Sequence, residues 1–283
     1  MATGNLVVGS DGELTLTIGR WAKDKLFYIG RYCDIFSAGM KGKWSIRTYI
    51  DLFAGPGMCL VQTTKREING SPLLALSCKV PFTHYFFNDI DPDVIKSLKV
   101  RTAAYSSVII DYFNKDCIDY FNKDCNVVVG ELLQKLPSGS LDFCFIDPFN
   151  WEISFDSIQK LTENRRMDLA VTFHIGNIKR VADNPPRELI SFFPDVNWQQ
   201  EYVKAGEDGR LTGRVLLDAY ERGLRSLGYK EIKDYVLAVN KTNVPLYYLI
   251  FASKHPRGAD FWDKIAGRSA AGQLRMPMVI EKG

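Results

Sequence analysis

Apolar positions along the chain recur with two different periods, and their alternation predicts an α/β protein. Runs of strand length, rich in β-branched and aromatic residues, alternate with segments whose apolar residues recur every three to five positions, as on the buried face of a helix. This order favours a mainly parallel, doubly wound sheet that ends in an antiparallel pair of strands. The predicted strands span 49–53, 84–87, 141–146, 168–173, 231–239 and 246–253. The predicted helices span 20–40, 93–101, 127–136, 154–166, 211–227 and 259–265, with one more near residue 71.

The pattern divides the chain into three predicted parts. Residues 1–45 form an N-terminal arm and helix, in which the first 19 residues are an edge strand or a loose arm. Residues 46–266 form the main domain, and the Gly/Ala/Arg-rich residues 267–283 form a mobile tail. Within the main domain, residues 57–69 are expected to be a long polar connection. It delays the next helix, for which Ser71-Pro72 supplies an N-cap and a first helical residue.

Two further segments of the main domain have no clear period. Residues 176–210 contain Pro185-Pro186 and are predicted to be irregular. Residues 111–117 and 119–125 are identical, Asp-Tyr-Phe-Asn-Lys-Asp-Cys, and two copies are too few for a solenoid. We interpret the repeat as a local duplication that lengthens a strand or loop.

Composition places the chain among ordinary globular proteins, with 46% hydrophobic and 24% charged residues in 283. The six cysteines include no Cys-x-x-Cys pair, so neither a metal site nor a redox dithiol is indicated. Several lie in apolar runs, as reduced core residues do, which favours a cytoplasmic protein. The amino terminus is polar and Gly-rich, so a signal peptide is not expected, and no apolar run reaches about 18 residues, so no membrane span is expected.

The net charge of +3 does not by itself indicate a nucleic-acid partner. Residues 20–47, however, contain seven Lys or Arg against two Asp. The ordinary interpretation of this segment is a solvated helix face. A basic face can also guide a polyanion, so nucleic acid stays among the candidate partners.

Residues 49–57, Tyr-Ile-Asp-Leu-Phe-Ala-Gly-Pro-Gly, join a predicted strand to a turn with two glycines. Glycine there permits a tight turn and lets a ligand approach the main chain, and open α/β sheets build nucleotide pockets at such strand ends. The dinucleotide fingerprint would need a third glycine where Leu60 stands. The pattern instead resembles the first motif of S-adenosylmethionine-dependent methyltransferases, Asp-x-Phe-x-Gly-x-Gly, which here comprises Asp51, Phe53, Gly55 and Gly57.

Acidic residues follow successive predicted strands, and each suits one part of S-adenosylmethionine. Asp51 could accept from the ammonium of the methionine moiety or orient the glycine turn. Asp89, with Asp91 as a second choice, could accept from both ribose hydroxyls. Asp124 could meet the adenine amino group, and the duplication makes Asp116 its rival. A single aspartate is more often a turn former or a helix cap, but three at successive strand ends after a glycine turn favour a cofactor site.

The strand predicted to lie beside the first ends in Asp147-Pro148-Phe149-Asn150. This tetrapeptide resembles the Asp-Pro-Pro-Tyr motif of amino-group methyltransferases, although the second proline is missing. By that resemblance Asp147 and Asn150 would hold an acceptor amine, Phe149 would stack on it, and Pro148 would fix the turn without a competing N–H. The chain has no Pro-Cys dipeptide, which argues against cytosine C5 methylation.

Several motifs together resemble the three-Cys-motif partner family. That resemblance implies a methyltransferase-like fold of Class I, Rossmann-like, and a protein partner, a radical-SAM-like protein that carries three cysteines. The motifs are Trp21-Ala-Lys-x-Lys-Leu, Tyr49-Ile-Asp-Leu-Phe-Ala-Gly-Pro-Gly, Gly70-Ser-Pro-Leu-Leu-Ala-Leu, Asp124-Cys-Asn and Phe145-Ile-Asp-Pro-Phe.

Three hypotheses about function follow. The first is an S-adenosylmethionine-dependent methyltransferase that acts on an amino group, including that of a nucleic-acid base, without a metal. The second is a non-catalytic methyltransferase-like partner of the three-Cys-motif protein. The third is a nucleic-acid-binding protein without chemistry, which rests on the basic segment 20–47.

Overall fold

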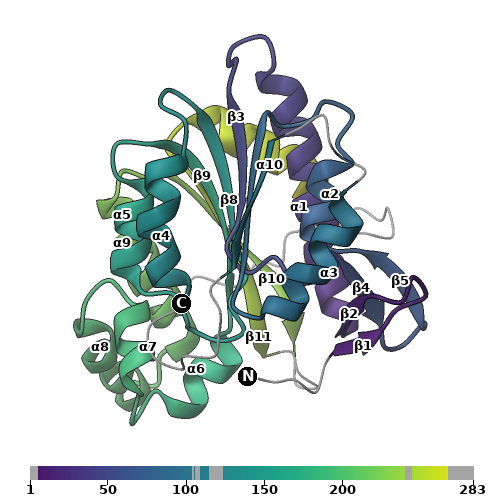
Figure 1. The fold of residues 1–283 in the computed structure, drawn as a ribbon. Helices are drawn as coiled ribbons and strands as arrows, with labels where there is room; N and C mark the ends of the chain where they lie inside the picture. The colour runs from purple at the N-terminus through teal and green to yellow at the C-terminus, as the bar shows by residue number, and fades with distance from the viewer. Residues whose placement is uncertain (1–5, 104, 106–108, 115–123, 240–243, 267–283) are drawn as a thin grey trace.

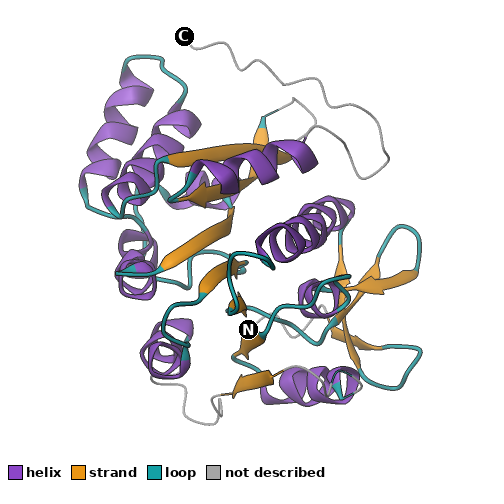
Figure 2. Cartoon of the chain, turned by 90° about the horizontal axis from the view of Figure 1, so that it is seen from above, coloured by secondary structure: helices purple, strands orange, loops and turns teal. Residues whose placement is uncertain are grey.

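The computed structural model describes residues 6–103, 105, 109–114, 124–239 and 244–266. It has a mixed α/β architecture: a seven-stranded sheet with helices on both faces, and a four-stranded sheet at one side (Figures 1 and 2). The strands are β1 (Leu6–Val8), β2 (Leu14–Ile18), β3 (Arg47–Asp51), β4 (Met58–Val61), β5 (Arg66–Asn69), β6 (His84–Asp89), β7 (Ile109–Asn114), β8 (Leu141–Ile146), β9 (Arg166–Phe173), β10 (Glu231–Val239) and β11 (Pro245–Ser253). The helices are α1 (Arg20–Met40), α2 (Ser71–Leu76), α3 (Pro92–Thr102), α4 (Cys125–Lys135), α5 (Phe155–Thr162), α6 (Ile175–Val181), α7 (Arg187–Phe192), α8 (Asn197–Glu207), α9 (Thr212–Ser226) and α10 (Pro256–Ala266).

The large sheet has the strand order β10-β11-β9-β8-β3-β6-β7. Strand β3 pairs in parallel with both β6 and β8, and these pair in parallel with β7 and β9. Strand β11 is antiparallel to both β9 and β10. The predicted mainly parallel sheet with a final antiparallel pair is therefore confirmed. The strand order reverses between β3 and β8, so a crevice is expected where their carboxyl ends meet.

The central strands are buried on both faces because successive side chains point to opposite sides. Ile50 of β3 packs in the cluster that includes α4, α5 and α9, whereas its neighbour Tyr49 packs in the cluster of α1, α3 and α10. The same alternation holds for Phe86 and Phe87 of β6. Figure 1 shows the two helical layers, with α4, α5 and α9 on the left and α1, α2 and α3 on the right.

The expected polar connection at residues 57–69 is wrong, because this segment is a β-hairpin. Strands β4 and β5 pair antiparallel, and β4 also pairs in parallel with β2 of the N-terminal arm, with Leu16 opposite Cys59. The two hairpins form the four-stranded sheet β1-β2-β4-β5, which packs on α1. These strands are short, and their pairing joins segments about 40 residues apart, so a local pattern does not reveal it.

The start of α2 also differs from the prediction. The N-cap is Gly70, and Ser71 is the first helical residue with Pro72 after it. A side chain at the N-cap would bring its Cβ to 3.0 Å from the carbonyl oxygen of Gly57, so glycine fits this close approach. The hydroxyl of Ser71 is free of the capping role and hydrogen-bonds the carboxyl group of Asp51 instead.

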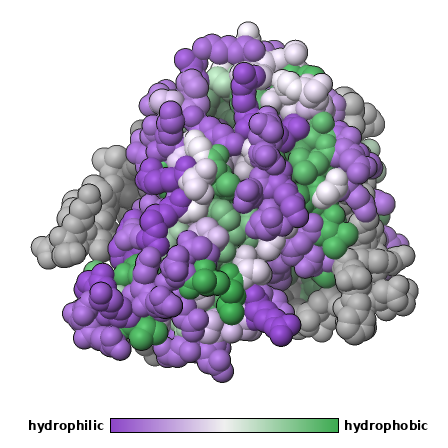
Figure 3. Space-filling model, turned by 90° about the vertical axis from the view of Figure 1, so that its left-hand side faces the viewer, coloured by the Kyte–Doolittle hydropathy of each residue, from purple (hydrophilic) through white to green (hydrophobic). Residues whose placement is uncertain are grey.

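The prediction that residues 176–210 are irregular is wrong, because they contain α6, α7 and α8. Pro186 precedes α7 as its N-cap, so the two prolines separate helices rather than prevent them. Leu189 of α7 and Trp198 of α8 are buried in the same core cluster as α9. Viewed from the left side of Figure 1, the surface is mostly hydrophilic with small apolar areas (Figure 3).

The basic segment 20–47 is only partly a solvated face. Lys23, Arg31 and two lysines at its end are exposed, but Lys25 and Arg47 are buried. Arg47 donates to the carbonyl oxygens of Trp44 and Pro81, at 2.6 and 3.2 Å. Two of the seven basic side chains therefore serve the interior rather than a polyanion.

Several predictions lie outside the described residues: the first five residues, the tail 267–283, Asp116 and most of the second copy of the duplication. The first four residues of the first copy, Asp111–Asn114, lie in β7. In the part of the chain that the structure describes, no helix is both long and apolar enough to cross a membrane.

Candidate functional site

The glycine turn after β3 has the conformation that its sequence requires. Gly55 and Gly57 have φ of +62° and +89°, in the left-handed region that favours glycine. A Cβ added at Gly55 would meet no atom within 4 Å, whereas one added at Gly57 would lie 2.9 Å from Leu98 Cδ1. The turn therefore packs against α3 at Gly57 and leaves open space at Gly55.

Asp51 lies at the end of β3 and is fully buried. Its Oδ2 accepts from the hydroxyl of Tyr49 at 3.1 Å and its Oδ1 from the main-chain N–H of Phe53 at 3.3 Å. Burial raises the pKa of Asp51 to about 7, and the nearby charge of Asp147 acts in the same direction. The bond to Phe53 lies two residues before Gly55, and both roles predicted for Asp51 stay predictions.

Asp89, at the end of β6, lies against the same turn. Its Oδ2 accepts from the N–H of Gly55 at 3.0 Å, and its Oδ1 accepts from the N–H of Asp91 at 3.1 Å. Burial raises the pKa of Asp89. Its neighbour Asn88 donates to the carbonyl oxygen of Leu52 at 2.8 Å, so two residues of β6 hold the turn. The structure thus brings Asp51, Asp89 and the two glycines together.

Asp91 and Asp124 cap helices. Asp91 accepts from the N–H groups of Asp93 and Val94 at the start of α3. Asp124 is exposed, and its Oδ1 accepts from the N–H groups of Asn126 and Val127 at the start of α4, at 2.9 and 3.3 Å. These are the ordinary roles of aspartate at a helix start. Contact of Asp124 with adenine stays a prediction.

Asp147 forms an ion pair that the sequence analysis missed. Lys25 of α1 places its Nζ 2.5 Å from both carboxylate oxygens of Asp147. Lys25 is only 5% exposed, and its Nζ also lies 4.8 Å from the centroid of the Trp21 ring. The sequence held one signal for the contact between Lys25 and Trp21: both belong to the motif Trp21-Ala-Lys-x-Lys-Leu and lie one helical turn apart.

The three residues after Asp147 differ in their surroundings. Pro148 is buried, whereas the Phe149 ring is among the exposed large apolar side chains, at 58%. The side-chain oxygen of Asn150 accepts from Nδ2 of Asn177 in the first turn of α6, at 2.7 Å. The loop is therefore fixed by α1 at one end and by α6 at the other, and the exposed Phe149 lies in sequence between these two contacts.

His174, directly after β9, is a second residue that the sequence analysis missed. Among the described residues, neither ring nitrogen has a hydrogen-bond partner of good geometry, although the main chain of Pro148 lies beside the ring. Burial lowers the pKa of His174 to about 4, so the imidazole is neutral at pH 7. Its ring meets Tyr247 edge-on at 4.9 Å, and Tyr247 stacks on Trp21 at 4.1 Å between centroids.

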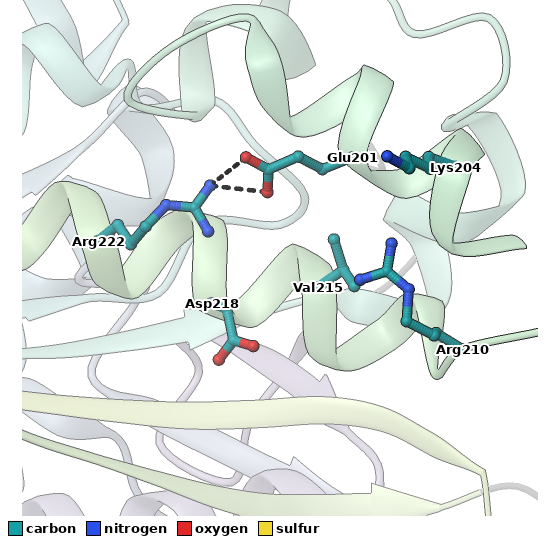
Figure 4. Close-up of a pocket in the computed structure, with 6 residues that line it drawn as sticks. All are labelled: Glu201, Lys204, Arg210, Val215, Asp218 and Arg222. Atoms are coloured by element: carbon teal, nitrogen blue, oxygen red, sulfur yellow. Dashed lines mark hydrogen bonds and ion pairs between the residues drawn. The ribbon is translucent and has the colours of Figure 1, made fainter. Parts of the chain in front are cut away.

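A surface cavity of about 340 Å³ lies elsewhere, between α8 and α9 (Figure 4). Glu201 and Arg222 line it and pair with each other at 2.8 Å. Its other lining residues are Lys204, Arg210, Val215 and Asp218. None of these comes from the ends of the parallel strands, so the cavity is separate from the site around the glycine turn.

No metal site emerges from the described residues, which contain no cluster of three or more His, Cys, Asp or Glu able to hold an ion. Five cysteines in this part of the chain are free and buried, namely Cys33, Cys59, Cys78, Cys125 and Cys144. Burial raises the pKa of the Cys33, Cys59, Cys125 and Cys144 thiols. These thiols are core residues rather than nucleophiles.

Comparison with known proteins gives a likeness of fold. No family model matches the chain, and no curated protein matches it. Among solved structures, protein LPL1258 from Legionella pneumophila str. Philadelphia 1 superposes with a TM-score of 0.50 and 12% identity over 86% of this chain and 89% of that one. Because the identity is so low, the likeness extends to the fold alone.

Two other solved structures are more distant. The N-terminal domain of EvdMO1, crystallised with SAH and D-fucose, gives a TM-score of 0.43 and 8% identity over 80% of this chain and 83% of that one. Precorrin-6y C5,15-methyltransferase from Geobacter metallireducens GS-15 gives a TM-score of 0.35 and 12% identity over 77% of this chain and 86% of that one. Neither carries an argument about this chain, and the three-Cys-motif partner family rests on the motifs alone.

Proposed function

We propose that the chain is an S-adenosylmethionine-dependent methyltransferase with a Class I fold, and that it methylates an amino group, such as that of a nucleic-acid base. The observation that supports this most is the reversal of strand order between β3 and β8, which brings the glycine turn beside Asp147. Numbered along the chain, the strands of the large sheet run 3-2-1-4-5-7-6, with strand 7 antiparallel. The Class I methyltransferase fold has this order.

The cofactor side of the proposed site consists of the glycine turn, Asp51 and Asp89. S-adenosylmethionine, when bound, would supply a methyl group on a sulfonium cation. The open space at Gly55 suits a ligand close to the main chain. The N–H groups of Gly55 and Asp91 bond different oxygens of Asp89, and a carboxylate with about four acceptor positions keeps capacity for a ribose hydroxyl. Asp124, as in the sequence analysis, is the proposed adenine contact.

We also propose a cytoplasmic location, which the free, buried cysteines of the described residues support.

The acceptor side consists of the loop Asp147–Asn150 with Lys25 and Asn177. A carboxylate has about four acceptor positions, so Asp147 can hold an amine while Lys25 keeps the carboxylate in place. The exposed ring of Phe149 offers a surface on which a base can stack. Transfer would depend on proximity and orientation, with the amine lone pair directed at the methyl carbon.

Titration calorimetry with S-adenosylmethionine and S-adenosylhomocysteine tests the cofactor site. We expect both to bind the wild-type chain, and the Asp89→Ala variant to bind at least about tenfold more weakly. Asp156→Ala is the matched control, because Asp156 is an exposed acid that pairs with Lys160 within α5. If the wild-type chain binds neither compound, the proposed function is wrong.

Transfer of a labelled methyl group to total RNA, DNA and protein tests the acceptor side. We expect Asp147→Ala to abolish transfer and to leave cofactor binding within about threefold. The Asp147→Ala, Lys25→Met double variant serves as a second form, since it leaves no unpaired buried ammonium. Transfer that survives in both variants would refute the role of Asp147.

A second candidate function is that of a non-catalytic partner of a three-Cys-motif radical-SAM-like protein. The observation in its favour is that Lys25 already contacts both oxygens of Asp147, where an acceptor amine would bind. Co-expression with such a neighbour separates the two candidates. A stable complex, together with no transfer to any acceptor, would favour the partner role.

A further inference from the structure

The N-terminal arm is built into the exit of the glycine turn. Strand β4 begins at Met58, directly after Gly57, and pairs in parallel with β2 of the arm. The N–H of Gly70, after β5, donates to the carbonyl oxygen of Gly57 at 2.7 Å. Figure 1 shows the four strands of this small sheet beside α3. The turn is thus held at its exit by a sheet to which the arm contributes two strands.

One arginine joins the arm, α3 and the turn. Arg101, in the last turn of α3, has a side chain only 5% exposed. Its Nη1 donates to the carbonyl oxygen of Pro56, between the two glycines, at 2.8 Å, and also to the carbonyl oxygen of Leu14. Its Nε and Nη2 donate to the two oxygens of Asp11, both at 2.8 Å.

Further contacts complete the connection. Nη2 of Arg101 also donates to Thr15 Oγ1 at 2.9 Å and to the carbonyl oxygen of Glu13 at 3.3 Å. The N–H of Leu14 donates to Ser97 Oγ, one helical turn before Arg101, at 3.0 Å. Every N–H-bearing nitrogen of the guanidinium is therefore used, and its acceptors come from the arm and from the glycine turn.

We propose that Arg101 is a positioning residue of the cofactor turn, and that the arm, Leu6–Ile18, is part of the cofactor site through it. This inference rests on the proposed function, since the turn matters as a cofactor site only if the chain binds S-adenosylmethionine. Arg101 acts through the carbonyl of Pro56: it fixes the peptide between Gly55 and Gly57, and the turn keeps the conformation that places Gly55 against Asp89.

The choice of arginine follows from geometry. A planar guanidinium can contact a carboxylate through two nitrogens and still direct a third group at a carbonyl, which a lysine ammonium cannot do in one fixed orientation. The hydrogen bond with Arg101 lowers the pKa of Asp11 to about 2, so Asp11 is charged at neutral pH. The contact between Asp11 and Arg101 is the part of this connection that can be removed at the surface, because Asp11 is 44% exposed.

Calorimetry with S-adenosylhomocysteine on Arg101→Lys and Asp11→Asn tests the proposal. We expect the dissociation constant to rise about 10- to 100-fold for Arg101→Lys and about 3- to 10-fold for Asp11→Asn, with unchanged stoichiometry. A merely structural role would lower the stoichiometry, as part of the sample unfolds, and leave the dissociation constant of the remainder unchanged. The matched controls are Arg222→Lys and Glu201→Gln, which alter a similar pair on α8 and α9.

Hydrogen exchange of the amides in residues 52–58 gives a second readout that needs no cofactor. We expect faster exchange in Asp11→Asn than in the wild-type chain, and no change in Glu201→Gln. If exchange is faster but the wild-type chain binds neither cofactor, the turn is anchored as inferred and the proposed function has failed. If the wild-type chain binds and both variants bind within twofold of it, with unchanged exchange, the inference is wrong.

Discussion

Buried or partly buried acids lie at both ends of the parallel strands, which we call the amino edge and the carboxyl edge of the large sheet. Their surroundings differ between the two edges. Near the amino ends of the strands, Asp142 accepts from Arg165 at 2.8 Å and from Ser140 at 2.6 Å. Near the carboxyl ends, Asp147 is paired with Lys25 but remains 23% exposed on its side chain, while that of Asp142 is fully buried. The carboxylate of Asp142 is thus enclosed by the protein, whereas that of Asp147 is partly open to solvent.

A second pair of acids shows the same contrast. Asp168 in β9 accepts from the hydroxyl of Tyr32 at 2.6 Å, and Ser253 also donates to it. Burial raises its pKa to about 6, and that of Asp51 to about 7. Asp51, however, faces the charge of Asp147, with open space nearby at Gly55. At the carboxyl edge, the charge of Asp147 acts on the pKa of both Asp51 and the buried His174. Interacting groups with shifted pKa values gather in this way at binding sites.

The largest effect on stability is expected at the amino edge. Arg165→Met should lower the free energy of unfolding by about 3 to 5 kcal/mol, because it leaves the buried charge of Asp142 without its cation. Urea unfolding measures this. The control is Lys160→Met, which removes an exposed pair with Asp156 and should cost less than about 0.5 kcal/mol.

Binding of S-adenosylhomocysteine by Arg165→Met tests whether a change at the amino edge leaves the carboxyl edge intact. The folded fraction of Arg165→Met should bind S-adenosylhomocysteine as the wild-type chain does, since the side chain of Arg165 donates to Asp142, Pro137 and Ser140 at the amino edge. If Arg165→Met lowers the free energy of unfolding by less than about 1 kcal/mol, Asp142 does not depend on its cation. If the variant binds S-adenosylhomocysteine much more weakly than the wild-type chain, the two edges are not independent.

At the carboxyl edge, Asp51→Asn should change how stability depends on pH. The pKa of Asp51 is raised above its ordinary value of 3.8, so its protonated form stabilises the folded state at low pH, and this contribution is lost as pH rises through about 7. The free energy of unfolding of the variant, relative to wild type, should therefore increase from pH 4 to pH 8 by at most about 4 kcal/mol. Unfolding measured at both pH values tests this, and a constant difference would contradict it.

The sequence predicted the large sheet well because each central strand is a continuous apolar run that ends in a turn. It also predicted that Asp51, Asp89 and the two glycines come together, since successive parallel strands place their ends at one edge. It could not predict the pairing of β2 with β4, or of Lys25 with Asp147, which are 122 positions apart. Long-range contacts of single side chains leave no period in the sequence.

His174 and Arg101 were missed for a related reason. His174 lies directly after β9, and Arg101 lies in the last turn of α3. Polar side chains are ordinary at both places, and only the folded structure shows what surrounds them. Asp124 illustrates the reverse case, because its observed main-chain contacts are those of a helix cap. Asp89 differs, because it accepts from the N–H of Gly55 in the turn itself.

Replacing His174 tests whether its ring serves function or packing. His174→Phe should raise the free energy of unfolding at pH 7 by about 1 to 2 kcal/mol, because it removes a buried imidazole whose nitrogens make no hydrogen bond of good geometry among the described residues. The gain should grow as pH falls from 6.5 to 4, since the lowered pKa makes the wild-type chain lose stability in that range. Methyl transfer should fall in the same variant, and a stabilised variant with full transfer would assign His174 to packing.

The smallest effect is expected at Asp124, and it decides between two roles of this residue. As a helix cap, Asp124→Ala should cost about 1 kcal/mol of stability, measured by urea unfolding, and leave the affinity for S-adenosylhomocysteine unchanged. As the adenine contact, it should cost the same stability and also weaken binding about tenfold. Asp195→Ala is the control, because Asp195 accepts from the N–H of Asn197 at the start of α8 and lies outside the proposed cofactor site. A loss of affinity in Asp124→Ala that exceeds that of Asp195→Ala would place Asp124 with Asp89 at the carboxyl edge, and equal affinities would leave it a cap.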